Sequence, residues 1–312
     1  MLQLSRGAST LLATAVIGIA IIGYVVGHGR SQGAPAEKVL SASAGNVLLT
    51  YPATWRAATA APEIKGLAIA HPLVLAPGGD AAQAGLVAGA LGGGEAAPLP
   101  RPLIALMRAL PETAVVDLLG SQAYRYAHVK LTGFERDLTL YAIPNPGGEE
   151  TVLACYAAAS VTADLRTCEH IVASLTLLGQ SQTYDLTPNP SYARELSAAV
   201  AALDQQRASL RREMAAKATT ATARAAATRL SAAYASAATS VSKLEPPSAA
   251  AAAQTTLTSS ILRASTAYKV FATAVAEEST TGLIVARKQI DEAETGVQGA
   301  LEVFALLGYQ QA

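Results

Sequence analysis

The histidines and acidic residues are the side chains of this sequence best suited to chemistry, and their spacing matches no common catalytic or metal-binding motif. The histidines, His28, His71, His128 and His170, form no HExxH or comparable metal-ligand spacing. Two carboxylate pairs, Glu135 with Asp137 and Glu149 with Glu150, lie in sequence typical of solvated turns. General acid–base catalysis needs carboxylates whose environments separate their pKa values, which solvated turn residues do not provide.

A short glycine-rich stretch is the nearest match to a nucleotide-binding loop. Residues 92–97 fit the pattern GxGxxA, but Pro98 and Pro100 stand where the phosphate-binding helix would begin. The chain contains no GxSxG, Walker A, SxxK or kinase motif, and an envelope hydrolase therefore has no support. We predict that the protein is not an enzyme and has no catalytic, cofactor-binding or metal-binding residues.

The composition is that of an ordered protein, and its balanced charge argues against a nucleic-acid binder. With 312 residues, the chain is long enough for about two domains. Its 23 basic residues are balanced by 23 acidic residues, so the basic excess of a nucleic-acid binder is missing. Alanine supplies much of the 51% hydrophobic content and aromatic residues only 5%, a composition that favours helix but buries little apolar area.

Residues 8–27 are uncharged and mainly apolar, which predicts a transmembrane helix. About 20 such residues rise roughly 30 Å, the thickness of a bilayer core. The alternative is a signal peptide cleaved after Ala34-Pro35-Ala36, although the apolar run exceeds the usual length of about 7–15 residues. No cysteine follows the segment, so a lipoprotein is not expected. We expect a cytoplasmic tail (1–7), an anchor in the cell membrane (8–27), a linker (28–45) and an extracytoplasmic remainder.

Residues 46–178 have the pattern of an α+β sandwich. Short β-type runs separated by Gly or Pro turns predict strands at 47–51, 67–75, 85–91, 115–119, 123–131, 137–143 and 151–157. Helices are predicted at 102–110 and 164–177. Because the separators are short, antiparallel pairing is favoured over βαβ crossovers.

The phase of two elements predicts a disulfide bond between the two cysteines. Strand alternation places Cys155 on the same face as Leu153, and the following helix places Cys168 on a stripe with Val172 and Leu175. Both thiols therefore point into the layer between strand and helix. Behind an export signal, such a pair more often forms a disulfide than remains as free thiols.

The same region resembles the PsbP/Mog1-like domains. The matching stretches are Tyr51-Pro52-Ala53-Thr54-Trp55, Tyr124-Arg125-Tyr126, Leu140-Tyr141-Ala142-Ile143-Pro144, Cys155, Cys168 and Leu175-Thr176-Leu177. Such domains occur in photosystem accessory proteins, in exported lipoproteins and outside some membrane-bound kinases. The resemblance covers residues 46–178 and implies binding or sensing rather than chemistry, and it transfers no site residues. Trp55 is predicted either to line a ligand pocket or to belong to the core.

A second linker (179–189) precedes an all-α segment, residues 190–312. Heptad-spaced apolar residues on both sides of Pro246-Pro247 predict an antiparallel helical hairpin with arms of roughly 80 Å. A break at Gly282 or within 219–222 would instead fold the arms into a small bundle. Tyr268, Phe271 and Phe304 are large for an alanine-rich seam, and we expect them to pack against the chain's own fold-back or another molecule.

The strongest charge feature is a basic cluster in the first of these helices, with the members Arg207, Arg211, Arg212, Lys217, Arg224 and Arg229. It either binds an anionic polymer or lipid headgroup, or forms a solvated face partly neutralised by Glu277 and Glu278.

Two functions remain open. The first is a non-enzymatic, membrane-anchored sensor, adaptor or scaffold of the cell envelope, with a protein partner or self-association through its helices. The second is an extracytoplasmic binding protein that holds a small apolar ligand in the sandwich. A ligand binder should have an apolar cavity in the sandwich, and a scaffold should have an exposed apolar stripe on the helices.

Overall fold

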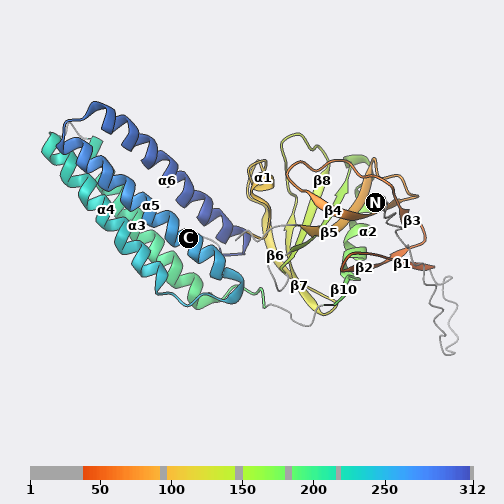
Figure 1. Cartoon of the computed structure of the whole chain (residues 1–312). Coiled ribbons are helices and arrows are strands. Elements are labelled where there is room, and N and C mark those ends of the chain that lie inside the picture. The colour runs from red at the N-terminus through yellow and green to blue at the C-terminus, as the bar shows by residue number, and fades with distance from the viewer. Residues whose placement is uncertain (1–37, 92–96, 145–149, 180–184, 216–218, 310–312) are drawn as a thin grey trace, which may run out of the picture.

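The computed structural model describes residues 38–91, 97–144, 150–179, 185–215 and 219–309. They form an α/β sandwich and a bundle of long helices that extends away from it (Figure 1). The predicted transmembrane segment 8–27 lies outside these residues, as do the tail and the start of the first linker. In the described part, no helix has both the length and the apolarity needed to cross a bilayer.

Two antiparallel sheets make up the sandwich in the described residues. The larger has seven strands, in the spatial order β3 (Trp55–Ala57), β4 (Ile69–Pro77), β5 (Ala84–Leu91), β9 (Glu150–Ala157), β8 (Asp137–Pro144), β7 (Ser121–Ala127) and β6 (Glu112–Leu118). The smaller has three strands, β1 (Val39–Ala44), β2 (Val47–Pro52) and β10 (Thr176–Leu177). The predicted antiparallel α+β class is therefore confirmed.

Strand alternation divides the larger sheet into two buried faces. Leu153 and Cys155 point toward α2 (Thr162–Ala173), whose Cys168 and Val172 pack against them. The intervening residues of β9, among them Tyr156, point to the opposite face. That face is covered by α1 (Arg101–Ile104) and the segments around it.

Three short strands were not predicted from the sequence. The predicted linker 28–45 contains β1, which turns through Gly45 (φ 59°) and pairs with β2. β3 and β10 are also absent from the prediction, and α1 is shorter than the helix predicted at 102–110. The predicted helix 164–177 ends earlier because its last residues leave α2 and join β2 as β10. Two short 3₁₀ helices lie at Ala159–Val161 and Ser248–Ala250.

The helical segment is a bundle rather than an extended hairpin. The helices described in it are α3 (Pro190–Ala215), α4 (Thr220–Ser242), α5 (Ala251–Ala276) and α6 (Thr280–Leu306). The side chain of Thr219 caps α4 and that of Ser279 caps α6, so each predicted long arm is divided. The fold-back that the sequence left as an alternative is therefore the correct one. Alanine-rich seams bury little area per turn, and stacking shorter helices around one core increases that burial.

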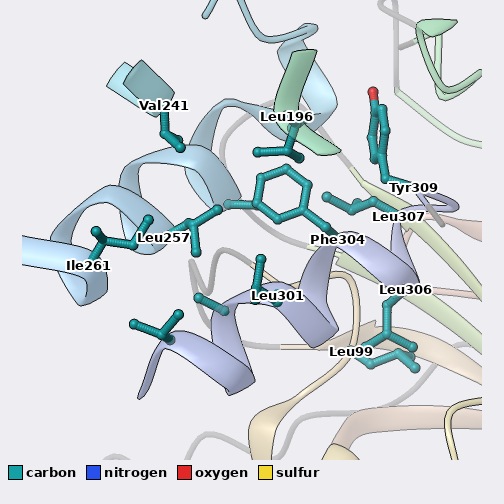
Figure 2. Packing of buried hydrophobic residues seen from close by; sticks show 14 of the residues in the cluster. Leu99, Leu196, Val241, Leu257, Ile261, Leu301, Phe304, Leu306, Leu307 and Tyr309 are labelled. Carbon is teal, nitrogen blue, oxygen red and sulfur yellow. The ribbon is translucent and has the colours of Figure 1, made fainter. Parts of the chain in front are cut away.

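The bundle and the sandwich share one continuous apolar core. Figure 2 shows the end of α6, where Phe304 packs among Leu196, Leu257 and Tyr309 while Leu306 approaches Leu99 of the sandwich. The residues joining the two parts also dock, because the Leu186 main-chain N–H donates to Gln122 Oε1 at 2.8 Å. The predicted second linker therefore ends in a packed segment.

Candidate ligand-binding groove

A groove of about 920 Å³ opens along the outer edge of β4. We call it the β4-edge groove. Its walls are β1 and Tyr51 of β2 on one side, the first half of β4, and the segment 57–67 on the other side. Ligand pockets in proteins typically have volumes of about 300–1,000 Å³, so the groove is large enough for a small molecule.

The groove exists because the edge strand β3 is short. β3 pairs with β4 only at Leu75–Pro77, and Ala58 adds one further hydrogen bond from its N–H to the carbonyl of Val74 at 3.0 Å. The chain then leaves the sheet as a loop. In the described part, no strand follows the outer side of β4 at residues 69–73.

The backbone of β4 is irregular beside the groove. The pairing of β4 with β5 shifts between Ala70 and Leu73. At this bulge, His71 has a φ of 49°, a conformation that a residue other than glycine rarely adopts. Pro72 follows and has no N–H to donate. The outer edge of β4 is therefore poorly suited to pairing with another strand.

The walls of the groove are mainly apolar, with polar groups at the rim. The apolar side chains include Ile64, Leu67, Ile69, Leu73 and Val87. The polar side chains are Ser41, Ser43, Thr59, Glu63, His71 and Tyr51. Burial raises the pKa of Tyr51 above its ordinary value of 10.0, so its hydroxyl stays protonated well into the alkaline range. Sequence reasoning did not identify these residues as a ligand site, although Pro72 within a strand-like run is typical of an edge strand.

Trp55 belongs to the core and does not line the β4-edge groove. Its side chain is 2% exposed and packs in the layer with Leu49 and Ile171. It also borders a separate hollow of about 500 Å³ beside α2, together with Asp164 and His170.

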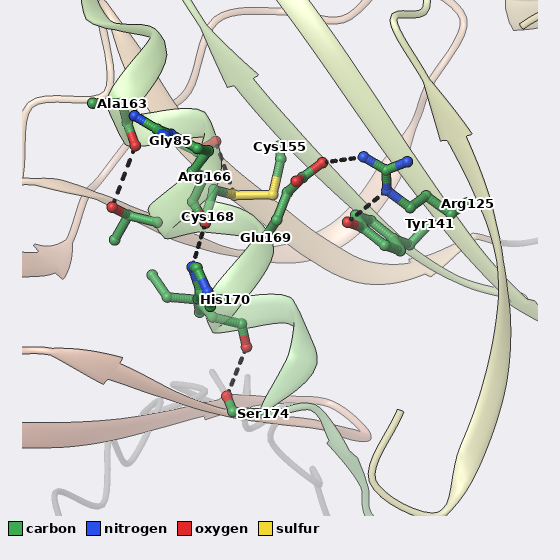
Figure 3. The surroundings of a disulfide bond; sticks show 12 residues. Gly85, Arg125, Tyr141, Cys155, Ala163, Arg166, Cys168, Glu169, His170 and Ser174 are labelled. Carbon is green, nitrogen blue, oxygen red and sulfur yellow. Dashed lines mark hydrogen bonds and ion pairs between the residues drawn. A yellow bond between two sulfur atoms is a disulfide. The ribbon is translucent and has the colours of Figure 1, made fainter. Parts of the chain in front are cut away.

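The predicted disulfide bond joins Cys155 to Cys168, whose Cα atoms lie 5.8 Å apart. Figure 3 shows a second attachment of α2 to the sheet beside it. Arg125 Nη2 on β7 pairs with Glu169 Oε1 at 2.7 Å, and Arg125 Nε donates to the hydroxyl of Tyr141 at 3.3 Å. α2 is thus held by a covalent bond and a half-buried ion pair, of which the sequence predicted only the former.

Two members of the basic cluster, Arg207 and Arg211 on α3, are directed into the bundle, where they meet one carboxylate of α6. Glu294 accepts hydrogen bonds from Tyr234 at 2.5 Å and Tyr268 at 2.9 Å. Its carboxylate also pairs with Arg207 at 3.2 Å and Arg211 at 2.8 Å. We call this group the Glu294 cluster. It draws on all the long helices described, and sequence reasoning missed Glu294 because its partners are far away in the chain.

The predicted anionic-partner patch is therefore partly occupied by the protein itself. Arg207 pairs with Asp204 as well as Glu294, and Arg212 Nε donates to the carbonyl of Ala208 at 3.1 Å. Lys217 lies outside the described residues. The carboxylate that neutralises Arg211 is Glu294, not the expected Glu277 or Glu278.

The three seam aromatics are buried inside the chain's own bundle. The exposed fractions are 2% for Tyr268, 7% for Phe271 and 0% for Phe304. The ring of Tyr268 stacks on that of Tyr234, with centroids 5.5 Å apart, and Phe304 contacts Tyr309 edge-on. Of the two outcomes predicted for this seam, fold-back of the same chain is the one observed.

The sandwich has a weak structural likeness to a protein of known structure. No family model matches the chain, and no curated protein matches it. The solution structure of the cyanobacterial PsbP protein (CyanoP) from Synechocystis sp. is similar with a TM-score of 0.30 and 11% sequence identity. That match covers 48% of this chain and 98% of CyanoP. This chain thus has a weak structural likeness to a PsbP protein, and the match does not address the helical bundle.

Proposed function

We propose that the protein is a non-enzymatic, membrane-tethered binding protein of the cell envelope, and that it holds a small, mainly apolar ligand in the β4-edge groove. The observation that carries this proposal is a groove of about 920 Å³ in the sandwich with apolar walls and a polar rim. Of the two functions considered from the sequence, only the ligand binder calls for such a cavity.

The irregular outer edge of β4 favours a small-molecule ligand over a bound peptide. A peptide bound by strand addition gains its affinity from main-chain hydrogen bonds along a regular edge. The bulge between Ala70 and Leu73 and the imino nitrogen of Pro72 interrupt that edge. The ligand is therefore held by side-chain contacts with the apolar walls.

The tether and the compartment rest on two sequence features. Residues 8–27 have the length and apolarity of a bilayer-spanning helix, and the Cys155–Cys168 bond suits an oxidising compartment. We propose that residues 8–27 are retained as the anchor and that the sandwich and the bundle lie outside the membrane. An intact N-terminus on the membrane-bound protein supports this arrangement, and a mature form beginning at Glu37 would contradict it.

Binding can be tested with Nile red, a neutral apolar fluorophore, and with variants that fill the groove. Ala60 and Ser43 are exposed residues on opposite walls, so Ala60→Trp and Ser43→Trp should narrow the groove without disturbing the core. Ala232→Trp places the same side chain on an exposed position of α4 and serves as the matched control.

We expect saturable binding of Nile red to the wild-type protein and the Ala232→Trp variant, and weaker binding to at least one groove variant. Absence of saturable binding to the wild-type protein, or equal affinity in all four proteins, would refute the proposal.

A second candidate function is an adaptor that contacts a protein partner through the bundle. It is favoured by exposed apolar side chains on α5 and α6, namely Leu262, Val270, Ile284 and Val285. Ile284 is the most exposed of them at 67%. If the bundle binds a partner there, Ile284→Lys should remove a cross-linked species from intact membranes, whereas Glu292→Lys on the same helix should not. An unchanged cross-linking pattern in Ile284→Lys would exclude this contact.

A further inference from the structure

The side chains that line the β4-edge groove carry few charges, and these have one sign. Glu63 is the one carboxylate among the described lining residues, and this lining contains neither lysine nor arginine. The nearest cation along the chain, Lys65, is exposed and outside the lining. The groove therefore presents the carboxylate of Glu63 at its rim, and its described lining has no lysine or arginine to offset that charge.

The charge is placed at the mouth and the apolar surface lies deeper. Glu63 is exposed, whereas Ile64, the next residue, is 6% exposed and packs into the core. Leu67, Ile69 and Val87 continue the apolar wall beyond Ile64. A ligand that buries an apolar body against this wall thus leaves its head group near the carboxylate of Glu63.

From this arrangement we infer that the β4-edge groove selects a lipophilic amine, meaning an amphiphile with an apolar body and an ammonium head, and disfavours an anionic amphiphile such as a fatty acid. This inference rests on the proposed function, since it specifies the ligand class of the same groove. An ammonium head gains a charge partner in Glu63. A carboxylate head loses water, meets a like charge and finds no lysine or arginine in the described lining.

Three probes with one apolar body and different head groups test the selection. Octylamine, octanol and nonanoate share the same octyl chain and are cationic, neutral and anionic at pH 7. Each is titrated against Nile red bound to the full-length protein in an amphipathic polymer, with protein-free polymer as the blank. Because Glu63 is exposed, we expect octylamine to bind about two- to fivefold more tightly than octanol, and nonanoate to bind more weakly than octanol. High salt should reduce these differences.

A matched pair of variants assigns the effect to Glu63. Glu63→Gln should make octylamine and octanol equal, whereas Glu112→Gln, which removes an exposed carboxylate from the far edge strand β6, should keep the wild-type order. Nonanoate binding as tightly as octylamine, or a wild-type order in Glu63→Gln, would overturn the inference while leaving the proposed function standing. Failure of Nile red and all three probes to bind would instead overturn the proposed function.

Discussion

The hydroxyl of Tyr126 on β7 donates a hydrogen bond to the main-chain carbonyl of Leu306 at the end of α6, across 2.9 Å and 180 residues of sequence. The Tyr126 side chain is fully buried, and burial raises its pKa well above the usual value. Around this bond, Leu306 and Leu99 belong to the apolar core that the sandwich and bundle share. The bundle is therefore fixed to one face of the larger sheet.

The change Tyr126→Phe tests this attachment. It leaves the Leu306 carbonyl without its hydroxyl donor, and a buried carbonyl that loses its hydrogen bond costs about 1–3 kcal/mol of unfolding free energy. We expect denaturant unfolding to shift to lower concentration and the transitions of sandwich and bundle to separate. Tyr124→Phe, a change of the same type two residues away, is the control. Equal stability of the two variants would contradict a special role for the Tyr126 hydroxyl.

Removing the disulfide should weaken the sandwich and spare the bundle. Cys155 and Cys168 are 13 residues apart, and a bond closing a loop of this size stabilises by about 3 kcal/mol in the chain-entropy model. The double change Cys155→Ala with Cys168→Ala should lower the free energy of unfolding of the sandwich by about this amount. Helical circular dichroism of the bundle should persist. Two free thiols in the exported wild-type protein, measured by alkylation under denaturing conditions, would refute the bond.

The Glu294 cluster should hold α3 in the bundle. The Glu294 side chain is 14% exposed, so its hydrogen bonds are largely shielded from water. Glu294→Gln removes the charge that faces Arg207 and Arg211, and we expect a loss of about 1–3 kcal/mol. Hydrogen exchange should accelerate most in α3. Glu292→Gln breaks an exposed pair with Lys288 on the same helix and should cost less than about 1 kcal/mol. Similar losses of unfolding free energy in both variants would contradict a stabilising role for the Glu294 cluster.

Alkaline pH should destabilise the protein through its buried phenols. Burial raises the pKa of Tyr156 to about 12 and that of Tyr268 to about 12, from the ordinary value of 10.0. Between these values the unfolded chain releases the phenol protons while the folded protein keeps them, so stability falls as the pH rises. We expect the unfolding free energy to be constant below about pH 9 and to decline through about pH 12. Denaturant titrations across this pH range test the prediction. A denaturant midpoint of unfolding that stays unchanged at the alkaline end would contradict the raised pKa values.

Local patterns in the sequence were sufficient for the larger strands and the disulfide. The runs that became β5, β8 and β9 are mainly apolar, short and bounded by turn residues, which is typical of strands buried on both faces. Cys155 and Cys168 lie on adjacent elements, and the phase of each element alone placed both thiols in the same layer. The possible helix breaks at 219–222 and Gly282 could likewise be recognised from the local sequence, although the sequence left them as alternatives to unbroken arms.

Tertiary structure decided the features that depend on distant partners. β3 and β10 are too short to have a clear pattern, and β1 is built mainly from small residues, so each exists because another strand supplies its hydrogen bonds. The β4-edge groove depends on where β3 stops, so no single segment encodes it, and Trp55 was the residue singled out for a ligand instead. Glu294 has the sequence signature of a solvated helix residue. It becomes the centre of a charged cluster only when the fold-back brings Arg207, Arg211, Tyr234 and Tyr268 around it, because a carboxylate's environment is set by its neighbours in space.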